Sequence, residues 1–262
     1  MSPILLAVLL LAGLGLFAGL ILAIASVLMA VPVDERVEAV REALPGANCG
    51  ACGYSGCAGY ANAMVNEDAP VGLCSPGGNE VAEATGKLLG KSGNVVRQTA
   101  VVRCGGCEEF TARKLDYHGI PSCRAATQFF GGNWLCNYGC LGYGDCAVAC
   151  EYGAITIKDG LAHIDSTLCR GCTKCTAACP KKLIVMNDGN VRGVVRCSNR
   201  DKGAQTRKAC KVGCIGCGKC QRTCEHDAIH VVNNVAVIDE EKCIGCGKCA
   251  EACPVKCIDI FN

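Results

Sequence analysis

The chain has 262 residues, 26 of them cysteine, and its 26 lysines and arginines against 24 aspartates and glutamates give a formal net charge of +2. This near balance indicates neither a nucleic-acid-binding surface nor an acidic tail, so we expect no nucleic-acid partner. Runs of the form C-x2-C-x2-C place thiols too close together for ordinary bridging, which argues against a disulfide scaffold and favours metal ligation in a reducing compartment.

The first predicted element is a membrane-spanning helix at the N-terminus. Residues 1–33 contain no Asp, Glu, Lys or Arg and are dominated by Leu, Ala, Val and Ile. This run is longer than the roughly 20 residues that a helix needs to cross a bilayer. A cleavable signal peptide would have a basic start and a shorter apolar core. We therefore expect a single-pass anchor over residues 1–33, in contact with membrane lipid.

The second predicted element is a cysteine motif that follows the anchor. Its spacing is C-x2-C-x4-C-x16-C, formed by Cys49, Cys52, Cys57 and Cys74. Four thiolates in one short segment suit one [4Fe-4S] cluster, and a zinc ion held by the same thiolates is the alternative. We expect a small helical cluster domain over residues 34–80, followed by a linker and bridging segment over residues 81–135.

Four cysteine runs of the two-cluster ferredoxin type come next. Three have the intact form C-x2-C-x2-C-x3-C: Cys169, Cys172, Cys175 and Cys179; Cys214, Cys217, Cys220 and Cys224; and Cys243, Cys246, Cys249 and Cys253. In the remaining run Cys140, Cys146 and Cys150 are in register, but Tyr143 replaces the second cysteine. Cys214 lies 74 residues after Cys140, and Cys243 lies 74 residues after Cys169, which indicates an internal duplication.

The duplication predicts two tandem dicluster ferredoxin-like modules, over residues 136–187 and 212–262, with a second bridging segment over residues 188–211. Short strand patterns flank turn signals between the cysteine runs, at residues 154–157, 161–164, 229–232 and 235–238, and closing strands are expected at residues 183–186 and 258–261. The expected fold class is α+β, with one N-terminal transmembrane helix, a small helical [4Fe-4S] domain and these two modules.

Ligand sets follow from the rule that the fourth cysteine of each run ligates the other cluster of the pair. The rule assigns three clusters: Cys214, Cys217, Cys220 and Cys253; Cys243, Cys246, Cys249 and Cys224; and Cys169, Cys172, Cys175 and Cys150. A further set contains Cys140, Cys146 and Cys179 and lacks the ligand lost at Tyr143. We expect Cys136, just upstream, to replace it, and a cluster with three cysteine ligands is the alternative.

A sixth cluster is suggested by four of the remaining cysteines. Cys197 and Cys210 lie 74 residues after Cys123 and Cys136, and residues 101–104 recur as residues 194–197. This register favours a sixth set of Cys104, Cys123, Cys197 and Cys210, with buried free thiols as the alternative. Cys107 and Cys257 have no repeat partner and are expected not to be ligands. The cofactors are thus five [4Fe-4S] clusters, with the sixth left open, and no catalytic residue is expected.

The order of these parts resembles the RnfB family, the B component of Rnf ion-translocating ferredoxin:NAD oxidoreductase complexes. The resemblance covers nearly the whole chain and indicates the longer form, with two ferredoxin modules. It rests on PGANCGACGYSGC at residues 45–57 with Cys74, YHGI at 117–120, YGCLG at 138–142, RCSN at 196–199 and DKG at 201–203. One departure is that Glu rather than Pro follows Cys150 and Cys224.

The resemblance implies a function that ligand spacing alone does not supply. Such a protein accepts electrons from reduced soluble ferredoxin and relays them to membrane, flavin-bearing and NAD-reducing Rnf subunits, within a translocase that pumps Na⁺ or H⁺. It also implies a cell (inner) membrane location with the cluster domains on the cytoplasmic side, and no complete active site on this chain. The alternative is a polyferredoxin adaptor that feeds a different membrane oxidoreductase. The coupling ion and the direction of electron flow stay open.

Overall fold

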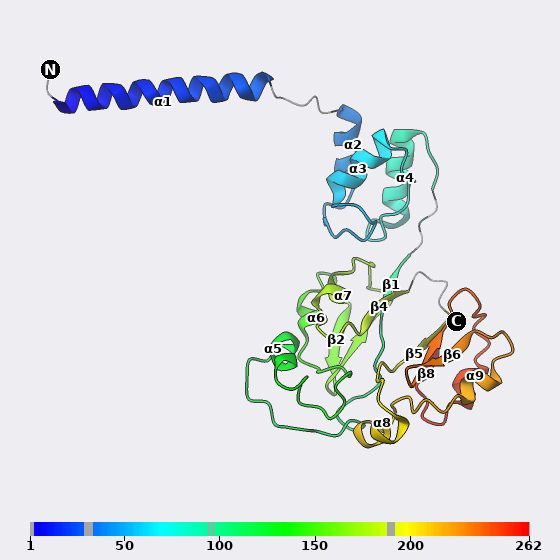
Figure 1. Ribbon diagram of the computed structural model, residues 1–262. Helices are drawn as coiled ribbons and strands as arrows, with labels where there is room; N and C mark the ends of the chain where they lie inside the picture. Colours follow the sequence, from blue (N-terminus) through cyan, green and yellow to red (C-terminus); the bar gives the residue numbers. More distant parts are fainter. Residues whose placement is uncertain (1–2, 29–33, 94, 96, 188–191, 262) are drawn as a thin grey trace.

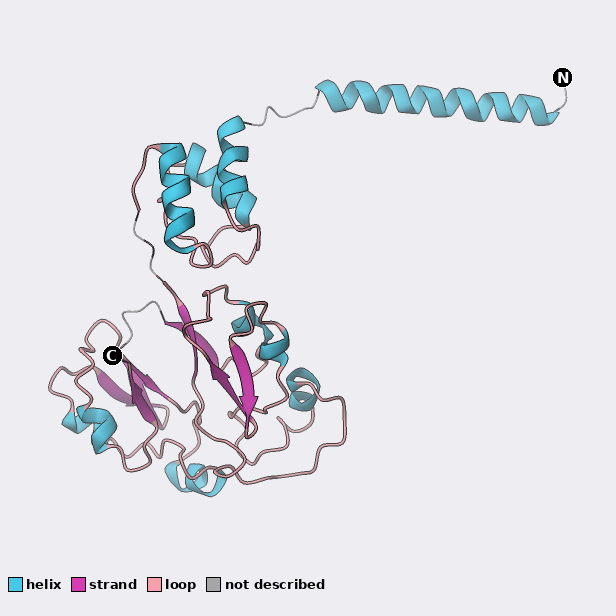
Figure 2. Cartoon of the chain, turned by 180° about the vertical axis from the view of Figure 1, so that it is seen from behind, coloured by secondary structure: helices cyan, strands magenta, loops and turns pink. Residues whose placement is uncertain are grey.

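The computed structural model describes residues 3–28, 34–93, 95, 97–187 and 192–261. Three parts follow one another along the chain: a long single helix, a helical domain, and a larger body of short strands and helices (Figure 1). Within the described residues, the strands belong to the larger body, as the colouring in Figure 2 shows. The mixed helix and strand composition agrees with the expected fold class.

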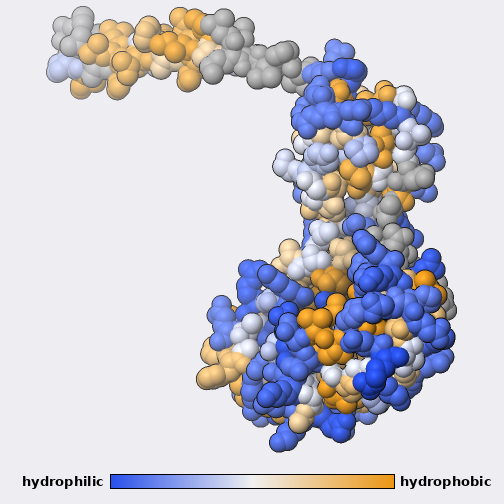
Figure 3. Space-filling model, turned by 45° about the vertical axis from the view of Figure 1, so that its right-hand side comes forward, coloured by the Kyte–Doolittle hydropathy of each residue, from blue (hydrophilic) through white to orange (hydrophobic). Residues whose placement is uncertain are grey.

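Helix α1 (Pro3–Leu28) is the candidate membrane span. Its 26 residues correspond to a length of about 39 Å at 1.5 Å per residue, which exceeds a hydrocarbon core of about 30 Å. The segment Leu9–Ser26 has a mean hydropathy of 2.4 and is not covered by the rest of the chain. Figure 3 shows this helix as a continuous apolar surface. The ends of the expected anchor, at residues 1–2 and 29–33, lie outside the described residues.

The helical domain contains helices α2 (Glu35–Ala43), α3 (Cys57–Asn66) and α4 (Gly78–Leu89). The carboxylate of Asp34 caps α2 by accepting a hydrogen bond from the amide of Arg36. Val40, Tyr60 and Ala82, one from each helix, belong to the same buried core. Helix α4 is therefore part of this domain, which extends to Leu89 rather than ending at the expected boundary of residue 80.

The larger body consists of two halves with matching element order. The first contains β1 (Thr99–Val102), α5 (Cys123–Gln128), α6 (Asp145–Val148), β2 (Ile155–Lys158), β3 (Leu161–Ile164), α7 (Lys174–Ala178) and β4 (Ile184–Asn187). The second contains β5 (Gly193–Val195), α8 (Gly203–Ala209), α9 (Lys219–Thr223), β6 (Ile229–Val232), β7 (Val235–Ile238), α10 (Lys248–Ala252) and β8 (Ile258–Ile260). The strands expected between and after the cysteine runs are confirmed to within one residue at each end.

Each half has two antiparallel strand pairs. The hairpins β2–β3 and β6–β7 are those that the turn signals predicted. The closing strands pair with strands from the bridging segments, β4 with β1 and β8 with β5, in registers that align Thr99 with Asn187 and Gly193 with Ile260. The sequence patterns did not predict β1 and β5, because strands of three or four residues carry little periodic signal.

The two halves differ in the length of the segment that follows their first strand. The amide of Arg103 donates to the carbonyl of Leu183 at 2.7 Å, and the amide of Arg196 donates to the carbonyl of Cys257 at 2.7 Å, so these positions are equivalent. Cys104 therefore corresponds to Cys197. Cys140 follows Cys104 by 36 residues, whereas Cys214 follows Cys197 by 17, so the first half has 19 extra residues here. The extra segment contains helix α5.

The helical domain contacts the first half through backbone carbonyls near residue 170. The hydroxyl of Ser75 donates to the carbonyl of Arg170 at 3.3 Å and accepts from the amide of Gln98 at 3.2 Å. The guanidinium of Arg97 donates to the carbonyls of Ser166 and Thr167, both at 3.0 Å. Because Ser75 follows Cys74 and Arg170 follows Cys169, this contact brings two cysteine-bearing loops together.

Candidate iron-sulfur sites

All 26 cysteines lie in the described residues and are free thiols. In the part of the chain that the structure describes, no three His, Cys, Asp or Glu side chains converge closely enough to hold one metal ion. Groups of four or five cysteines line hollows in the helical domain and in the larger body.

The hollow in the helical domain is lined by Cys49, Cys52, Cys57 and Cys74. Two hydrogen-bonded side chains shape the loops around it. The side-chain oxygen of Asn48 accepts from the amide of Cys57 at 2.9 Å, across Gly56, whose φ of +100° favours glycine. The hydroxyl of Tyr60 donates to the carbonyl of Pro70 at 2.8 Å and accepts from the amide of Leu73 at 3.1 Å, which positions the loop before Cys74.

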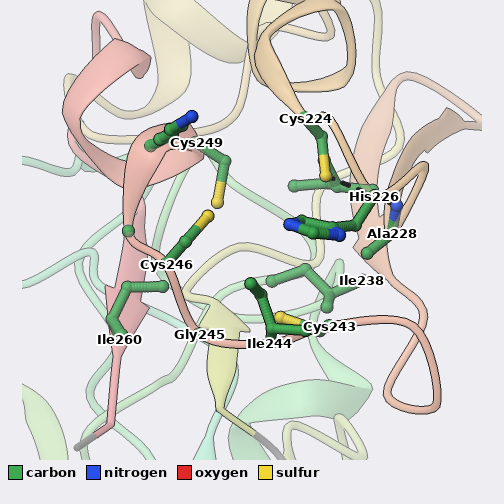
Figure 4. Close-up of a pocket in the computed structure, with 13 residues that line it drawn as sticks. Cys224, His226, Ala228, Ile238, Cys243, Ile244, Gly245, Cys246, Cys249 and Ile260 are labelled. Atoms are coloured by element: carbon green, nitrogen blue, oxygen red, sulfur yellow. Dashed lines mark hydrogen bonds between the residues drawn. The ribbon is translucent and has the colours of Figure 1, made fainter.

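Two similar hollows in the larger body each combine three cysteines of one run with one from its paired run. The cysteines of the hollow in the first half are Cys150, Cys169, Cys172 and Cys175. The cysteines of the hollow in the second half are Cys224, Cys243, Cys246 and Cys249. Figure 4 shows Cys224 across this second hollow from the other three. The structure thus brings together two of the sets that the interleaving rule selects.

A fourth group gathers around Cys220 in the second half. Burial raises the pKa of the Cys220 thiol to about 11, and its neighbours Cys214, Cys253 and Cys217 add to this shift. These four are a further set that the interleaving rule selects. A fifth thiol adjoins them, because the Cys257 sulfur lies 3.7 Å from that of Cys253. The Cys257 thiol also donates to Cys214, which lowers the pKa of Cys214 although burial acts in the opposite direction.

The thiols of the incomplete run have Cys123, rather than Cys136, as an electrostatic neighbour. Burial raises the pKa of the Cys146 thiol to about 12, and the thiols that add to the shift are Cys140, Cys123 and Cys179. Cys140 has the same neighbours, Cys123 and Cys179. Cys123 is therefore the thiol that joins Cys140, Cys146 and Cys179 in this group, where Cys136 was expected from the sequence.

Cys136 lies in a central hollow between the two halves. The cysteines that line this hollow are Cys104, Cys136, Cys140, Cys197 and Cys210, and Cys140 contributes its backbone amide, which donates to the Cys104 sulfur at 3.4 Å. The expected set had Cys123 in place of Cys136, so the two cysteines exchange roles relative to the sequence expectation. The reason is the extra segment: Cys104 is the counterpart of Cys197, and the 74-residue spacing from Cys123 to Cys197 is coincidental.

Gly106 leaves space beside the cysteines of the central hollow, and two neighbouring side chains donate hydrogen bonds to cysteine sulfurs there. A Cβ on Gly106 would lie 3.1 Å from the Cys210 sulfur and 3.8 Å from the Cys104 sulfur, so a side chain there would intrude. The amide of Asn199 donates to the Cys136 sulfur at 3.6 Å, and the hydroxyl of Thr111 donates to the Cys210 sulfur at 3.8 Å. Such donors stabilise thiolate ligands and raise the potential of a cluster that they hold.

The six groups adjoin one another in a row. Cys49 of the helical domain is an electrostatic neighbour of Cys172, so the first group faces the outer group of the first half. The amide of Cys140 donates to the Cys104 sulfur at 3.4 Å, which joins the incomplete run to the central group. Hydrogen bonding from the backbone of Cys214 to Cys197 joins the central group to the second half. Cys107 and Cys257 are not counted in the six groups, and the Cys257 sulfur adjoins the group around Cys220.

The two glutamates that replace proline after Cys150 and Cys224 have a structural role. Lys174 pairs with Glu151, and Lys248 pairs with Glu225 at 2.6 Å. Each pair joins the residue before the third cysteine of one run to the residue after the fourth cysteine of its partner run. These exposed pairs contribute little stability individually, but they connect the two loops that line each outer hollow.

Family models match both ends of this arrangement. Residues 44–76 match a model described as a putative Fe-S cluster, and residues 210–260 match a 4Fe-4S dicluster domain. These matches and the cysteine-lined hollows define the chain as an iron-sulfur protein of the electron-transfer class. Its domains are ferredoxin-like and fit electron transfer.

Curated relatives then identify the family. The B component of the ion-translocating oxidoreductase complex of Methanosarcina acetivorans is 40% identical over 252 residues, which cover 95% of this chain and 96% of that protein. The B component of the Na⁺-translocating ferredoxin:NAD⁺ oxidoreductase complex of Acetobacterium woodii is 42% identical over 93% of this chain and 74% of its own length. The proton-translocating counterpart of Clostridium ljungdahlii is 40% identical over 86% and 81%. The chain belongs to the RnfB family of ion-translocating oxidoreductase complex components.

Proposed function

We propose that this chain relays electrons from reduced ferredoxin toward the membrane, flavin-bearing and NAD-reducing subunits of a redox-driven Na⁺ or H⁺ pump. The observation that carries the proposal is the row of six four-cysteine groups from the helical domain to the end of the chain. The names of the Acetobacterium woodii and Clostridium ljungdahlii relatives support ferredoxin and NAD⁺ as the redox partners of the complex. A polyferredoxin adaptor need not carry the N-terminal motif that matches at residues 44–76.

The proposed cofactors are six [4Fe-4S] clusters, because four cysteine thiolates are the usual ligand set of such a cluster. Three ligand sets follow from the interleaving rule and one from the N-terminal motif, as expected from sequence. The two revised sets are Cys123, Cys140, Cys146 and Cys179 for the incomplete run, and Cys104, Cys136, Cys197 and Cys210 for the central site. Each bound cluster would supply reversible one-electron chemistry at its site.

The protein residues would hold, insulate and tune the clusters. Burial raises the pKa of the Cys104 thiol to about 12, so cluster binding must displace protons from these cysteines. Backbone amides would then donate to bound thiolates, as Ala100 donates to Cys169 and Ala228 to Cys224, both at 3.4 Å. Donors of this kind set the potential at each step.

The adjacency of the six sites supports one unbranched order. From the helical domain, the order is the N-terminal site, the outer and inner sites of the first half, the central site, and the inner and outer sites of the second half. The central site would then be the connection between the two ferredoxin-like modules. Helix α1 would hold the helical-domain end near the membrane, with the clusters on the cytoplasmic side.

The proposal is tested by counting metal in the anaerobically purified full chain. We expect about twenty-four irons and about twenty-four acid-labile sulfides per chain, with negligible zinc. The brown absorption should bleach when reduced ferredoxin is added in catalytic amounts with an electron donor. A colourless, zinc-loaded protein, or an iron-loaded protein that reduced ferredoxin cannot bleach, would contradict the proposed function.

A prediction concerns Cys257, one of the two cysteines that are not counted in the six groups. The equivalent position in the first half is Leu183, and Cys257 is 2% exposed, so leucine should fit the site as an apolar side chain. We expect Cys257→Leu to retain the full iron content, whereas Cys220→Ser, in the group that Cys257 adjoins, should lose about four irons. Iron analysis of both variants checks this, and a loss in Cys257→Leu would show that Cys257 is a ligand.

A further inference from the structure

The incomplete run differs from the intact runs at two positions. Besides Tyr143 in place of a cysteine, it has Asp145 directly before its third cysteine, where the intact runs have Lys174, Lys219 and Lys248. Two of these lysines form ion pairs with glutamates of the neighbouring run: Lys174 with Glu151, and Lys248 with Glu225. Asp145 contacts the extra segment instead, so its carboxylate has a different role from these lysines.

The Asp145 carboxylate holds the start of helix α5. One of its oxygens accepts a hydrogen bond from the amide of Cys123 at 2.8 Å. The other accepts from the amide of Arg124 and from the hydroxyl of Ser122, both at 3.0 Å. Hydrogen bonds to an ionised carboxylate are among the stronger ones in proteins. These three bonds fix the backbone at the residue whose thiol completes the group.

Tyr143 also contacts the extra segment. Its ring lies edge-on to that of Tyr117, with centroids 5.6 Å apart. Tyr117, Cys123 and Tyr143 pack against one buried cluster that includes Trp134 and Leu141. Both exceptional residues of the run therefore face the segment that delivers Cys123.

We propose that Asp145 is a positioning residue that orients Cys123 as the replacement for the ligand lost at Tyr143. The inference rests on the proposed ligand set of Cys123, Cys140, Cys146 and Cys179. The extra segment, Tyr143 and Asp145 then form one unit: the segment supplies the thiol, and the carboxylate fixes the backbone that carries it. Both oxygens of Asp145 accept from donors of residues 122–124, so its role acts through the backbone of Cys123 and not as a ligand.

The test is a cycle of variants of the full chain, purified anaerobically in detergent. Cys123→Ser should lose about four of about twenty-four irons, together with one electron paramagnetic resonance signal of the reduced protein. Adding Tyr143→Cys to Cys123→Ser recreates an intact run and should restore both. The remaining irons, about twenty, report that each variant is folded and loaded elsewhere.

Asp145→Asn is then compared in two backgrounds. In the otherwise native chain we expect a loss of about two to four irons, or a shifted signal and midpoint potential for this one cluster. In the Cys123→Ser, Tyr143→Cys background we expect no change, because Cys123 is no longer a ligand. A coupling of this kind between two positions is what a cycle of double variants isolates. Asp145→Glu should retain part of the native signal, and the matched Lys219→Asn should change neither iron nor signal.

The outcomes separate the inference from the proposed ligand set. If Cys123→Ser retains all its iron, the ligand set is wrong, and the role of Asp145 is overturned with it. If Cys123→Ser loses the cluster but Asp145→Asn has native iron, signal and potential, the ligand set stands and the positioning role is overturned. Equal effects of Asp145→Asn in both backgrounds would show a general structural role and would also overturn the inference.

Discussion

The Cys197→Ser, Cys210→Ser variant is expected to bind about twenty irons per chain in place of about twenty-four. Cys197 and Cys210 are the two cysteines that the second half contributes to the central site, so the other five clusters should persist. The larger effect concerns electron flow, because in the proposed order the central site connects the two halves and electron transfer slows steeply with distance. We expect ferredoxin to reduce the clusters on one side of the central site at the native rate. The clusters on the other side should remain oxidised over many native turnover times.

Iron analysis and rapid-mixing absorption measurements check this result. Cys136→Ser should remove the same cluster signal as the double variant, whereas Cys123→Ser should remove a different one. The matched control is Cys107→Ser, a cysteine that lies outside all six groups and should leave iron and kinetics unchanged. Equal iron content in the native chain and the double variant would mean that the central cysteines are structural.

Deletion of residues 1–33 is expected to move the chain from the membrane to the soluble fraction with its full iron content. Helix α1 has the one span-like segment found in the described residues, and no cysteine lies in the deleted part. The cluster sites should therefore assemble without it. Fractionation and iron analysis, in a host that lacks the partner subunits, measure both properties.

The matched variant for the anchor is Leu14→Arg, Phe17→Arg in the full chain. An arginine near the centre of a spanning helix costs about 2.5 to 3.5 kcal/mol on insertion scales, so two of them should strongly reduce insertion. Leu14→Ala, Phe17→Ala should remain in the membrane. If the truncated chain stays in membranes after a high-salt wash, another surface anchors it, and the role given to α1 is wrong.

The sequence predicted much of the fold and most of the cysteine grouping. Ligand spacing determines which thiols can share a cluster over short distances, so the groups at Cys49, Cys169 and Cys243 could be assigned without a structure. The duplication likewise predicted the hairpins β2–β3 and β6–β7. Each of these inferences depends on residues close together in sequence or on an exact repeat.

The sequence was misleading where the repeat is interrupted. The spacing from Cys123 to Cys197 matches the repeat distance by coincidence, and the 19 extra residues before Cys140 hide the true counterpart, Cys104. A usable signal was present, because residues 101–104 recur as residues 194–197. Strands β1 and β5 explain that recurrence, since both pair with a closing strand and deliver the following cysteine to the central hollow.

The sequence by itself determined that this chain is an iron-sulfur protein with a candidate membrane span at its N-terminus, because cysteine spacing and apolar length are local properties with few physical explanations. Only the tertiary structure decided that Cys136 faces the central hollow while Cys123 joins the incomplete run, and that Asp145 holds the backbone of Cys123. These groupings depend on how segments of unequal length fold back on one another. Packing fixes that arrangement, and spacing along the chain does not encode it.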